Sequence, residues 1–166
     1  MNIWTIGAYG TTRESFLDAL CKEGVDILMD TRRRAGMRGA TYAFFNKGRL
    51  SEGCRSCGIE YIHVRDLAPT KEIRAIQSEY DKKHKQGKYG RDELCEAFVH
   101  EYKRQILGDQ TGREVFEKAL SVCQNQRAES VALFCVERDP KSCHRSLLAT
   151  YLADQLGVKV RGDLTP

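Results

Sequence analysis

The sequence predicts an α/β fold with a mostly parallel sheet of about four to five strands, helices on both faces and a helical insertion between strands 3 and 4. Two observations lead to this prediction. Short apolar runs alternate with segments of helical periodicity, which is the pattern of strand–helix–strand units. The chain of 166 residues also has the length of a single domain, expected over 1–166 with the insertion at about 70–108.

The amino-terminal segment forms the first strand–helix–strand unit. An apolar strand over 3–6 ends in the loop 7–10, and Thr12 is a residue type that caps helix starts. The apolar face of this helix is followed by a second strand over 25–29, which ends in Asp30-Thr31-Arg32. Two strands joined by a helix lie parallel in one sheet and are connected by a right-handed crossover.

The rest of the chain continues the alternation after the stretch 33–46, which has no steady periodicity and is predicted to be a long loop. Two polar helical segments, separated by a turn, form the predicted insertion. The expected elements are a helix over 47–57, a strand over 59–64, helices over 71–85, 92–106 and 111–124, a strand over 130–135, a helix over 146–156 and a short edge strand over 158–160.

Basic residues are unevenly distributed, although the net charge is only +4. The segment 32–49 contains several arginines and lysines and no acidic residue, and the segment 82–91 is basic and lies near Tyr80 and Tyr89. Basic side chains interleaved with aromatic ones suit a polyanion with stackable bases, so a nucleotide, DNA or RNA is the expected partner. The alternative is a solvated basic surface without a partner.

Cysteine usage and hydropathy indicate the compartment. Seven cysteines are scattered over a chain of ordinary length, which favours reduced thiols over a disulfide framework. The sequence has no run of about 18 apolar residues, and its start lacks the basic region and long apolar stretch of a secretory signal. We therefore expect a cytoplasmic protein with no membrane partner, and the sequence does not indicate its oligomeric state.

The stretch 131–145 concentrates the reactive side chains. An apolar strand runs into Cys135 and Glu137, Asp139-Pro140 has the composition of a helix start, and Cys143-His144-Arg145 stands at the first turn of the next predicted helix. Free N–H groups and the helix dipole bind anions at such a position and lower the pKa of a nearby thiol. Cys143 is therefore a candidate reactive thiol, with a buried structural cysteine as the alternative.

Four predicted strands end in polar residues, at 7–9, 30–32, 63–66 and 135–137. The carboxyl ends of parallel strands share one edge of a sheet, and the ligand crevice of such sheets lies there. The sequence therefore predicts one site. Its candidate catalytic residues are Cys143, His144, Glu137 and His63, and its candidate substrate-binding or anion-binding residues are Arg32, Arg145, Asp30, Gly7 and Tyr9.

The order of these motifs resembles the family called domain of unknown function 488. The resemblance rests on Thr5-Ile6-Gly7, Asp30-Thr31-Arg32, the stretch from Gly58 to His63, and Cys135-Val136-Glu137 followed by Cys143-His144-Arg145. It spans nearly the whole chain and implies a compact α/β domain, but it supplies no substrate. The chain departs from the family pattern at Ala8-Tyr9, where His-Ser is usual, and at Ala68-Pro69, where Gly-Gly is usual.

Motifs for cofactors and metals are weak. The chain has neither Gly-x-Gly-x-x-Gly nor the lysine motif of a phosphate loop, so no nucleotide cofactor is predicted. Cys135, Cys143 and His144 are three candidate zinc ligands, but no second close pair with finger-like spacing accompanies them, and no metal is predicted. Cys54 and Cys57 have redox spacing but precede Gly58 at a helix end, so we interpret them as core residues.

These observations favour an enzyme-like domain that binds a phosphate-bearing substrate at the carboxyl ends of its strands. Glu137 would serve as a general base or hold a ribose hydroxyl, and the alternative for it is a structural ion pair with Arg32 or Arg145. Two other functions remain open. One is a non-catalytic nucleic-acid-binding module that uses 32–49 and 82–91, and the other is a thiol redox sensor built on Cys135 and Cys143.

Overall fold

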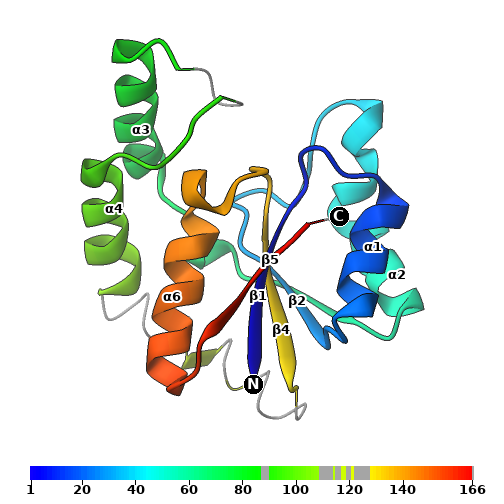
Figure 1. The fold of residues 1–166 in the computed structure, drawn as a ribbon. Helices are drawn as coiled ribbons and strands as arrows, with labels where there is room; N and C mark the ends of the chain where they lie inside the picture. Colours follow the sequence, from blue (N-terminus) through cyan, green and yellow to red (C-terminus); the bar gives the residue numbers. More distant parts are fainter. Residues whose placement is uncertain (87–89, 109–113, 115–116, 119–120, 122–127, 166) are drawn as a thin grey trace.

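In the computed structural model, five parallel strands form one sheet in the order β3-β2-β4-β1-β5, which confirms the predicted fold class (Figure 1). The strands are β1 (Asn2–Gly7), β2 (Ile27–Asp30), β3 (Glu60–His63), β4 (Ser130–Cys135) and β5 (Val160–Leu164). The structure describes all residues except 87–89, 109–113, 115–116, 119–120, 122–127 and 166. The helix predicted over 111–124 lies largely outside the described residues.

The middle of the sheet is apolar because both of its faces are covered. β4 lies between β2 and β1, and all of its residues are buried. A strand covered on both faces has a continuous rather than an alternating apolar pattern, which is the pattern that predicted it. β4 pairs with β1 from Asn2 opposite Ser130 to Gly7 opposite Cys135, so this register brings Gly7 beside Cys135 at the carboxyl edge.

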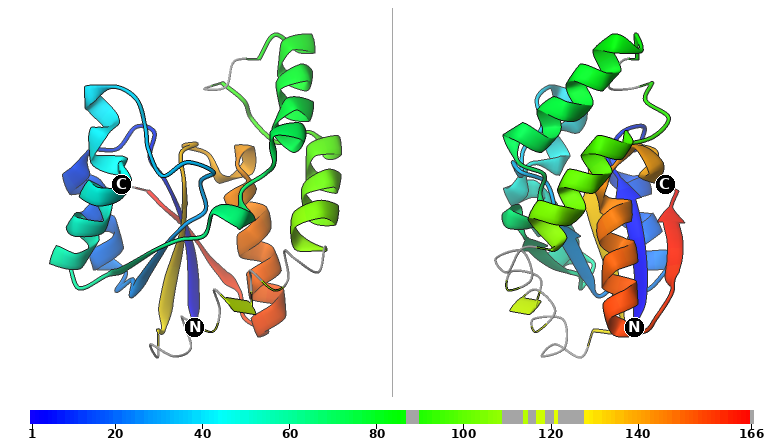
Figure 2. Two further views of the ribbon diagram at one scale, coloured as in Figure 1. Left: turned by 180° about the vertical axis from the view of Figure 1, so that it is seen from behind. Right: turned by 90° about the vertical axis from the view of Figure 1, so that its left-hand side faces the viewer.

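Helices cover both faces of the sheet, as predicted (Figure 2). α1 and α2 pack on one face around Phe16, Leu20 and Leu50, and α6 packs on the other face with α4 beside it and α3 next to α4. α3 and α4 are the insertion between β3 and β4. The helices are α1 (Arg13–Lys22), α2 (Lys47–Ser56), α3 (Lys71–Lys83), α4 (Glu96–Tyr102), which continues into a π-helical turn over Lys103–Leu107, and α6 (His144–Leu156).

Two segments and one side chain differ from the predictions. Cys54 is buried as predicted, but Cys57, also expected in the core, is exposed at the C-cap of α2, where the helix end faces solvent. The expected loop 33–46 contains a 3₁₀ helix over Ala40–Phe45, whose three-residue period leaves no α-helical repeat in the sequence. Phe45 anchors it, because its ring packs against Phe16 and Phe134. The short edge strand predicted over 158–160 is β5, which begins at Val160 and extends to Leu164. The residues after Val160 are mostly polar, so no apolar pattern marks the rest of the strand; an edge strand need not be apolar.

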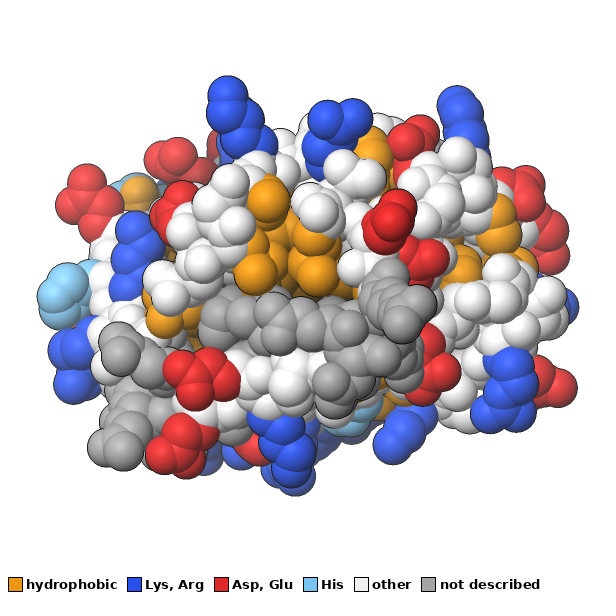
Figure 3. Space-filling model, turned by 90° about the horizontal axis from the view of Figure 1, so that it is seen from below, with side chains coloured by type: hydrophobic (Ala, Val, Ile, Leu, Met, Phe, Trp, Pro, Cys, Tyr) orange, Lys and Arg blue, Asp and Glu red, His pale blue; other side chains and the backbone are white. Residues whose placement is uncertain are grey.

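The two ends of the strands present different surfaces. The carboxyl ends meet at one edge next to the first turn of α6, at the top of the sheet in Figure 1. The opposite end is shown in Figure 3, where basic and acidic side chains are intermixed around the rim and hydrophobic side chains lie near the centre. Within the described part of the chain, every helix is too short or too polar to cross a membrane.

Candidate functional site

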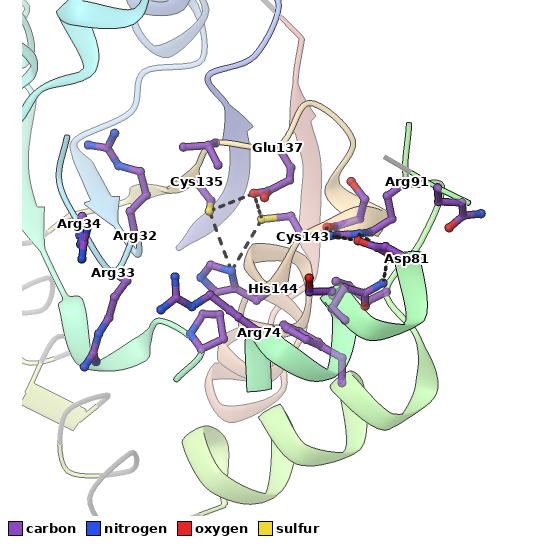
Figure 4. Close-up of a pocket in the computed structure, with 18 of the residues that line it drawn as sticks. Arg32, Arg33, Arg34, Arg74, Asp81, Arg91, Cys135, Glu137, Cys143 and His144 are labelled. Atoms are coloured by element: carbon purple, nitrogen blue, oxygen red, sulfur yellow. Dashed lines mark hydrogen bonds and ion pairs between the residues drawn. The ribbon is translucent and has the colours of Figure 1, made fainter. Parts of the chain in front are cut away.

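Four side chains converge at the carboxyl edge of the sheet: Cys135, Glu137, Cys143 and His144, referred to below as the thiol cluster (Figure 4). The Sγ atoms of Cys135 and Cys143 each lie 3.4 Å from Glu137 Oε2 and 3.9 Å from His144 Nδ1. The two sulfurs and Nδ1 lie within 4.8 Å of one another. The structure thus brings together three of the four predicted catalytic residues, with Cys135 as an additional member.

A short turn after β4 brings Cys143 back next to Cys135. Cys135 is the last residue of β4, and the chain then turns through a 3₁₀ helix over Pro140–Ser142. The Asp139 carboxylate caps this turn by accepting from the Lys141 N–H at 2.8 Å. Cys143 is the N-cap of α6, which confirms the predicted placement at a helix start.

The backbone just after β2 fixes the orientation of the His144 ring. His144 Nε2 lies 3.2 Å from the Thr31 carbonyl oxygen, and a carbonyl only accepts, so Nε2 carries a hydrogen. His144 Nδ1 therefore faces the two sulfurs. His63 is held in the same way by the next carbonyl, since its Nε2 donates to Arg32 O at 2.8 Å. His63 thus supports the end of β2 and lies outside the cavity described below.

Asp30 and Arg32 form a buried ion pair. Arg32 Nε and Nη2 lie 2.8 and 2.7 Å from the two carboxylate oxygens of Asp30, and Tyr61 donates its hydroxyl to the same carboxylate at 2.6 Å. Burial acts to lower the pKa of Arg32, but the Asp30 carboxylate outweighs burial and raises it. Arg32 also donates to Phe45 O, whereas its Nη1 has no hydrogen-bond partner among the described residues. Asp30 therefore positions Arg32. Of these two residues, Arg32 lines the cavity and Asp30 does not.

Arg145 holds the backbone around the cluster. Its side chain is fully buried, Nη1 donates to Glu137 O at 2.5 Å, and Nη2 donates to Arg138 O at 2.9 Å. Nη2 also lies 3.0 Å from Asp163 Oδ1 on β5. These bonds tie the loop after β4 to the edge strand, and Arg145 does not border the cavity. Its predicted role in anion binding remains a prediction.

The electrostatic environment separates the two thiols. Burial acts to raise the pKa of Cys143, but the hydrogen bond from Cys135 and the charges of His144 and Arg145 lower it well below its ordinary value. The hydrogen bond to Cys143, together with burial, raises the pKa of Cys135. Burial acts to lower the pKa of His144, but the Cys143 thiolate outweighs it and raises that pKa. Without any other ligand, the cluster favours a Cys143 thiolate beside a His144 imidazolium.

A cavity of about 470 Å³ opens next to the thiol cluster. Its volume is in the range of small-molecule sites. Arg33, Arg34 and Arg74, referred to below as the arginine wall, line one part of it, and Arg33 and Arg34 form no ion pair with any side chain that the structure describes (Figure 4). The Asp81–Arg91 ion pair, with Nη2 and Oδ2 at 2.5 Å, lines another part. The cavity thus combines a thiol cluster with arginine side chains, of which Arg33 and Arg34 form no ion pair with a described side chain.

Two further predicted residues, Gly7 and Tyr9, do not line the cavity. A Cβ atom on Gly7 would stand 2.2 Å from Glu137 O, so the absence of a side chain there allows the backbone of the cluster to approach β1. The Tyr9 ring packs edge-on against Tyr42, with ring centroids 5.4 Å apart. Their predicted roles in substrate binding remain predictions.

Sequence reasoning missed several residues of the site. Asp163, the partner of Arg145, lies on a strand whose polar sequence resembles a loop. Arg74 and Asp81 come from α3, and no local pattern links that helix to the end of β4. For Arg33 and Arg34 a signal was present, because they stand in the acid-free segment 32–49. The sequence does not show which of the basic residues in this segment line the cavity and which form ion pairs.

Fold and site together define an α/β domain with a thiol–imidazole site at the carboxyl ends of a parallel sheet. The family model described as "Domain of unknown function DUF488" matches residues 12–152, and the chain belongs to this family. The resemblance predicted from the sequence is thereby confirmed. Neither a curated protein nor a solved structure matches the chain. Family membership names no substrate, so function is argued from the site.

Proposed function

We propose that this protein is an enzyme-like domain that binds a phosphate-bearing substrate, a nucleotide or a segment of nucleic acid, in the cavity and acts on it through the thiol cluster. One observation carries the proposal: arginines that form no ion pair with a described side chain line the same cavity as the buried thiols and imidazole and the partly exposed Glu137 carboxylate. Guanidinium groups bind phosphate oxygens in a fork geometry, which suits Arg33 and Arg34 as phosphate ligands.

The thiol cluster supplies groups that act on the part of the substrate next to the phosphate. His144 and Glu137 exchange protons, and Cys143 is a nucleophile with a depressed pKa. Asp30 holds Arg32 at the margin of the cavity. Arg33 and Arg34 follow directly in the chain, so their backbone positions are fixed next to the cavity. Phosphate binding by these two arginines would hold the substrate against the cluster.

Binding titrations test the proposal. The probes are adenosine 5′-diphosphate and a short single-stranded oligonucleotide, each at two salt concentrations. We expect Arg33→Gln combined with Arg34→Gln to weaken binding at least about tenfold. For the oligonucleotide, the log–log slope of the salt dependence should fall by about 0.7 for each phosphate group that the variant no longer neutralises.

Arg38→Gln combined with Arg49→Gln is the matched control. Both residues are exposed and lie in the same basic segment, but they do not line the cavity. We expect this variant to bind within about twofold of the wild type, because exposed charges away from a ligand contribute little. An equal reduction of affinity in both double variants would instead support a non-catalytic module that binds through its outer surface. Absence of salt-sensitive binding to either probe would overturn the proposal.

A further inference from the structure

We infer that the thiol cluster is a binding site for a single divalent transition-metal ion, with zinc as the natural probe. The ligands are Cys135 Sγ, Cys143 Sγ and His144 Nδ1, and the Glu137 carboxylate occupies the fourth position on the side of the cavity. This inference concerns the cluster, and phosphate binding by the arginine wall does not depend on it. With the ion bound, Cys143, His144 and Glu137 would be its ligands, so the metal site would replace the roles of nucleophile and proton carrier proposed for them above.

The geometry is the first argument. The two sulfurs and His144 Nδ1 lie within 4.8 Å of one another, with sulfur–nitrogen separations of 3.9 Å, and Glu137 Oε2 lies 3.4 Å from each sulfur. A tetrahedral zinc site has zinc–sulfur bonds of about 2.3 Å and zinc–nitrogen bonds of about 2.0–2.1 Å, which place its ligand atoms roughly 3.5 Å from one another. The sulfur–nitrogen separations exceed this value by a few tenths of an ångström, and no pair among the two sulfurs and Nδ1, which lie within 4.8 Å of one another, needs to close by more than about 1.3 Å.

The hydrogen bonding around His144 is the second argument. A histidine that binds a metal through one ring nitrogen usually donates the hydrogen of the other to a carbonyl or carboxylate, which fixes the tautomer and the ring plane. His144 meets this condition, because Nε2 donates to Thr31 O at 3.2 Å and directs Nδ1 at the sulfurs. The Tyr102 ring, with its centroid 5.5 Å away and the ring itself fully buried, packs against the imidazole and limits its rotation.

Charge balance is the third argument. Two thiolates and one carboxylate around a divalent ion leave a net negative charge, which is costly in a buried site unless cations lie nearby. Arg32 and Arg145 provide part of that compensation: they are 4% and 0% exposed and their charges act on Cys135 and Cys143, although Asp30 and Asp163 offset part of their charge. Neither arginine can leave, since Asp30 and Asp163 hold them.

The donor set selects the kind of ion. Thiolate and imidazole ligands favour zinc and related borderline metals over magnesium or calcium, which prefer oxygen. Cys135, Cys143 and His144 are buried, and Glu137 is partly exposed at the cavity. A site with three buried ligands and a fourth position facing a cavity has the organisation of zinc sites in which a further ligand can reach the metal.

The experiment uses the full chain, stripped with a chelator under reducing conditions and titrated with Zn²⁺ or Co²⁺. We expect one ion per chain, a cobalt spectrum with thiolate-to-metal charge transfer, and a higher unfolding temperature with the ion bound. Cys143→Ser and Cys135→Ser should each abolish the charge-transfer band or reduce it to that of one thiolate. Glu137→Gln should weaken binding at least about tenfold, because even outer-shell partners of metal sites contribute that much.

The matched control is Cys54→Ser combined with Cys57→Ser, which removes a Cys-x-x-Cys pair elsewhere in the fold. This variant should bind the ion like the wild type. A measurement on the wild type alone guards against variants that fail to fold. Zinc should slow alkylation of Cys135 and Cys143 at least tenfold, as mapped by mass spectrometry, and leave the exposed Cys21 and Cys57 unchanged.

Three results would overturn the metal site. The first is the absence of stoichiometric binding to the reduced chain. The second is binding that survives replacement of both Cys135 and Cys143. The third is formation of a Cys135–Cys143 disulfide under mild oxidation at the same rate with and without zinc. That result would favour the redox-sensor alternative. None of these results depends on the titrations with nucleotide, so failure of the metal site and failure of phosphate binding are distinguishable.

Discussion

Replacement of Gly7 by alanine is the sharpest test of how the site is built. A Cβ atom at this position would lie 2.2 Å from Glu137 O, 3.1 Å from Glu137 C and 3.3 Å from Arg138 Cα, all of them backbone atoms. The loop after β4 would have to retreat by roughly 1 Å or more to restore van der Waals distances. That loop cannot retreat freely, because Glu137 O accepts from Arg145 Nη1 at 2.5 Å.

The size of the effect follows from these interactions. Overpacking of a well-packed region costs about 1–3 kcal/mol, and a hydrogen bond to a charged group contributes about 1.5–3 kcal/mol. We therefore expect Gly7→Ala to lower the free energy of unfolding by about 3 kcal/mol or more. Urea unfolding followed by the fluorescence of Trp4, the single tryptophan and a residue of β1, measures this decrease.

Gly48→Ala is the matched control for this prediction. Gly48 lies in α2, and nothing stands within 4 Å of the position its Cβ would take. Alanine is the better helix former, so the stability should stay the same or rise by up to about 1 kcal/mol. A lowering of the free energy of unfolding by less than about 0.5 kcal/mol in Gly7→Ala would refute this prediction. The backbone of Glu137 would then not need a residue without a side chain at position 7.

Two further predictions concern buried ion pairs. Asp30→Asn leaves the Arg32 guanidinium buried beside a neutral partner and should lower the free energy of unfolding in urea by about 3–5 kcal/mol, whereas a change below about 1 kcal/mol would contradict the proposed anchoring of Arg32. For Asp81→Asn the effect should depend on pH. Burial acts to raise the pKa of Asp81, but Arg91 and Gln77 outweigh it and lower the pKa below 3.8, so the pair stabilises the fold above pH 3.8 and loses this contribution as the pH falls through the lowered pKa. The difference in unfolding temperature between wild type and Asp81→Asn should therefore be largest near neutral pH and narrow below pH 3.8, and a constant difference would contradict the pairing.

The sequence was sufficient to predict the elements that depend on local pattern. The continuous apolar run of β4 was placed at both of its ends, and the turn at Asp139-Pro140 and the start of α6 after Cys143 followed from helix-capping preferences. These features are readable because each is determined by residues within one or two helical turns. The gathering of Cys143, His144 and Glu137 in one site was also predictable, because parallel strands bring their carboxyl ends to one edge.

What could not be predicted depends on partners far along the chain. The position of Arg145 at a helix start suggested anion binding, but did not indicate that its guanidinium donates to two carbonyls and to Asp163. A residue type and its position in a helix do not reveal whether a guanidinium already has partners inside the fold. For the same reason His63, which has the polarity of a catalytic residue, is engaged with the backbone of Arg32.

The bond between His144 and Thr31 spans 113 positions of the chain. A polypeptide that has formed only its local helices and turns lacks this bond, and its imidazole rotates freely beside two ordinary thiols. The arrangement of the four side chains is thus a property of the finished sheet alone. Nascent, partly unfolded or proteolysed chains would not display it, so the proposed metal binding and the proposed thiol reactivity would both require the folded sheet.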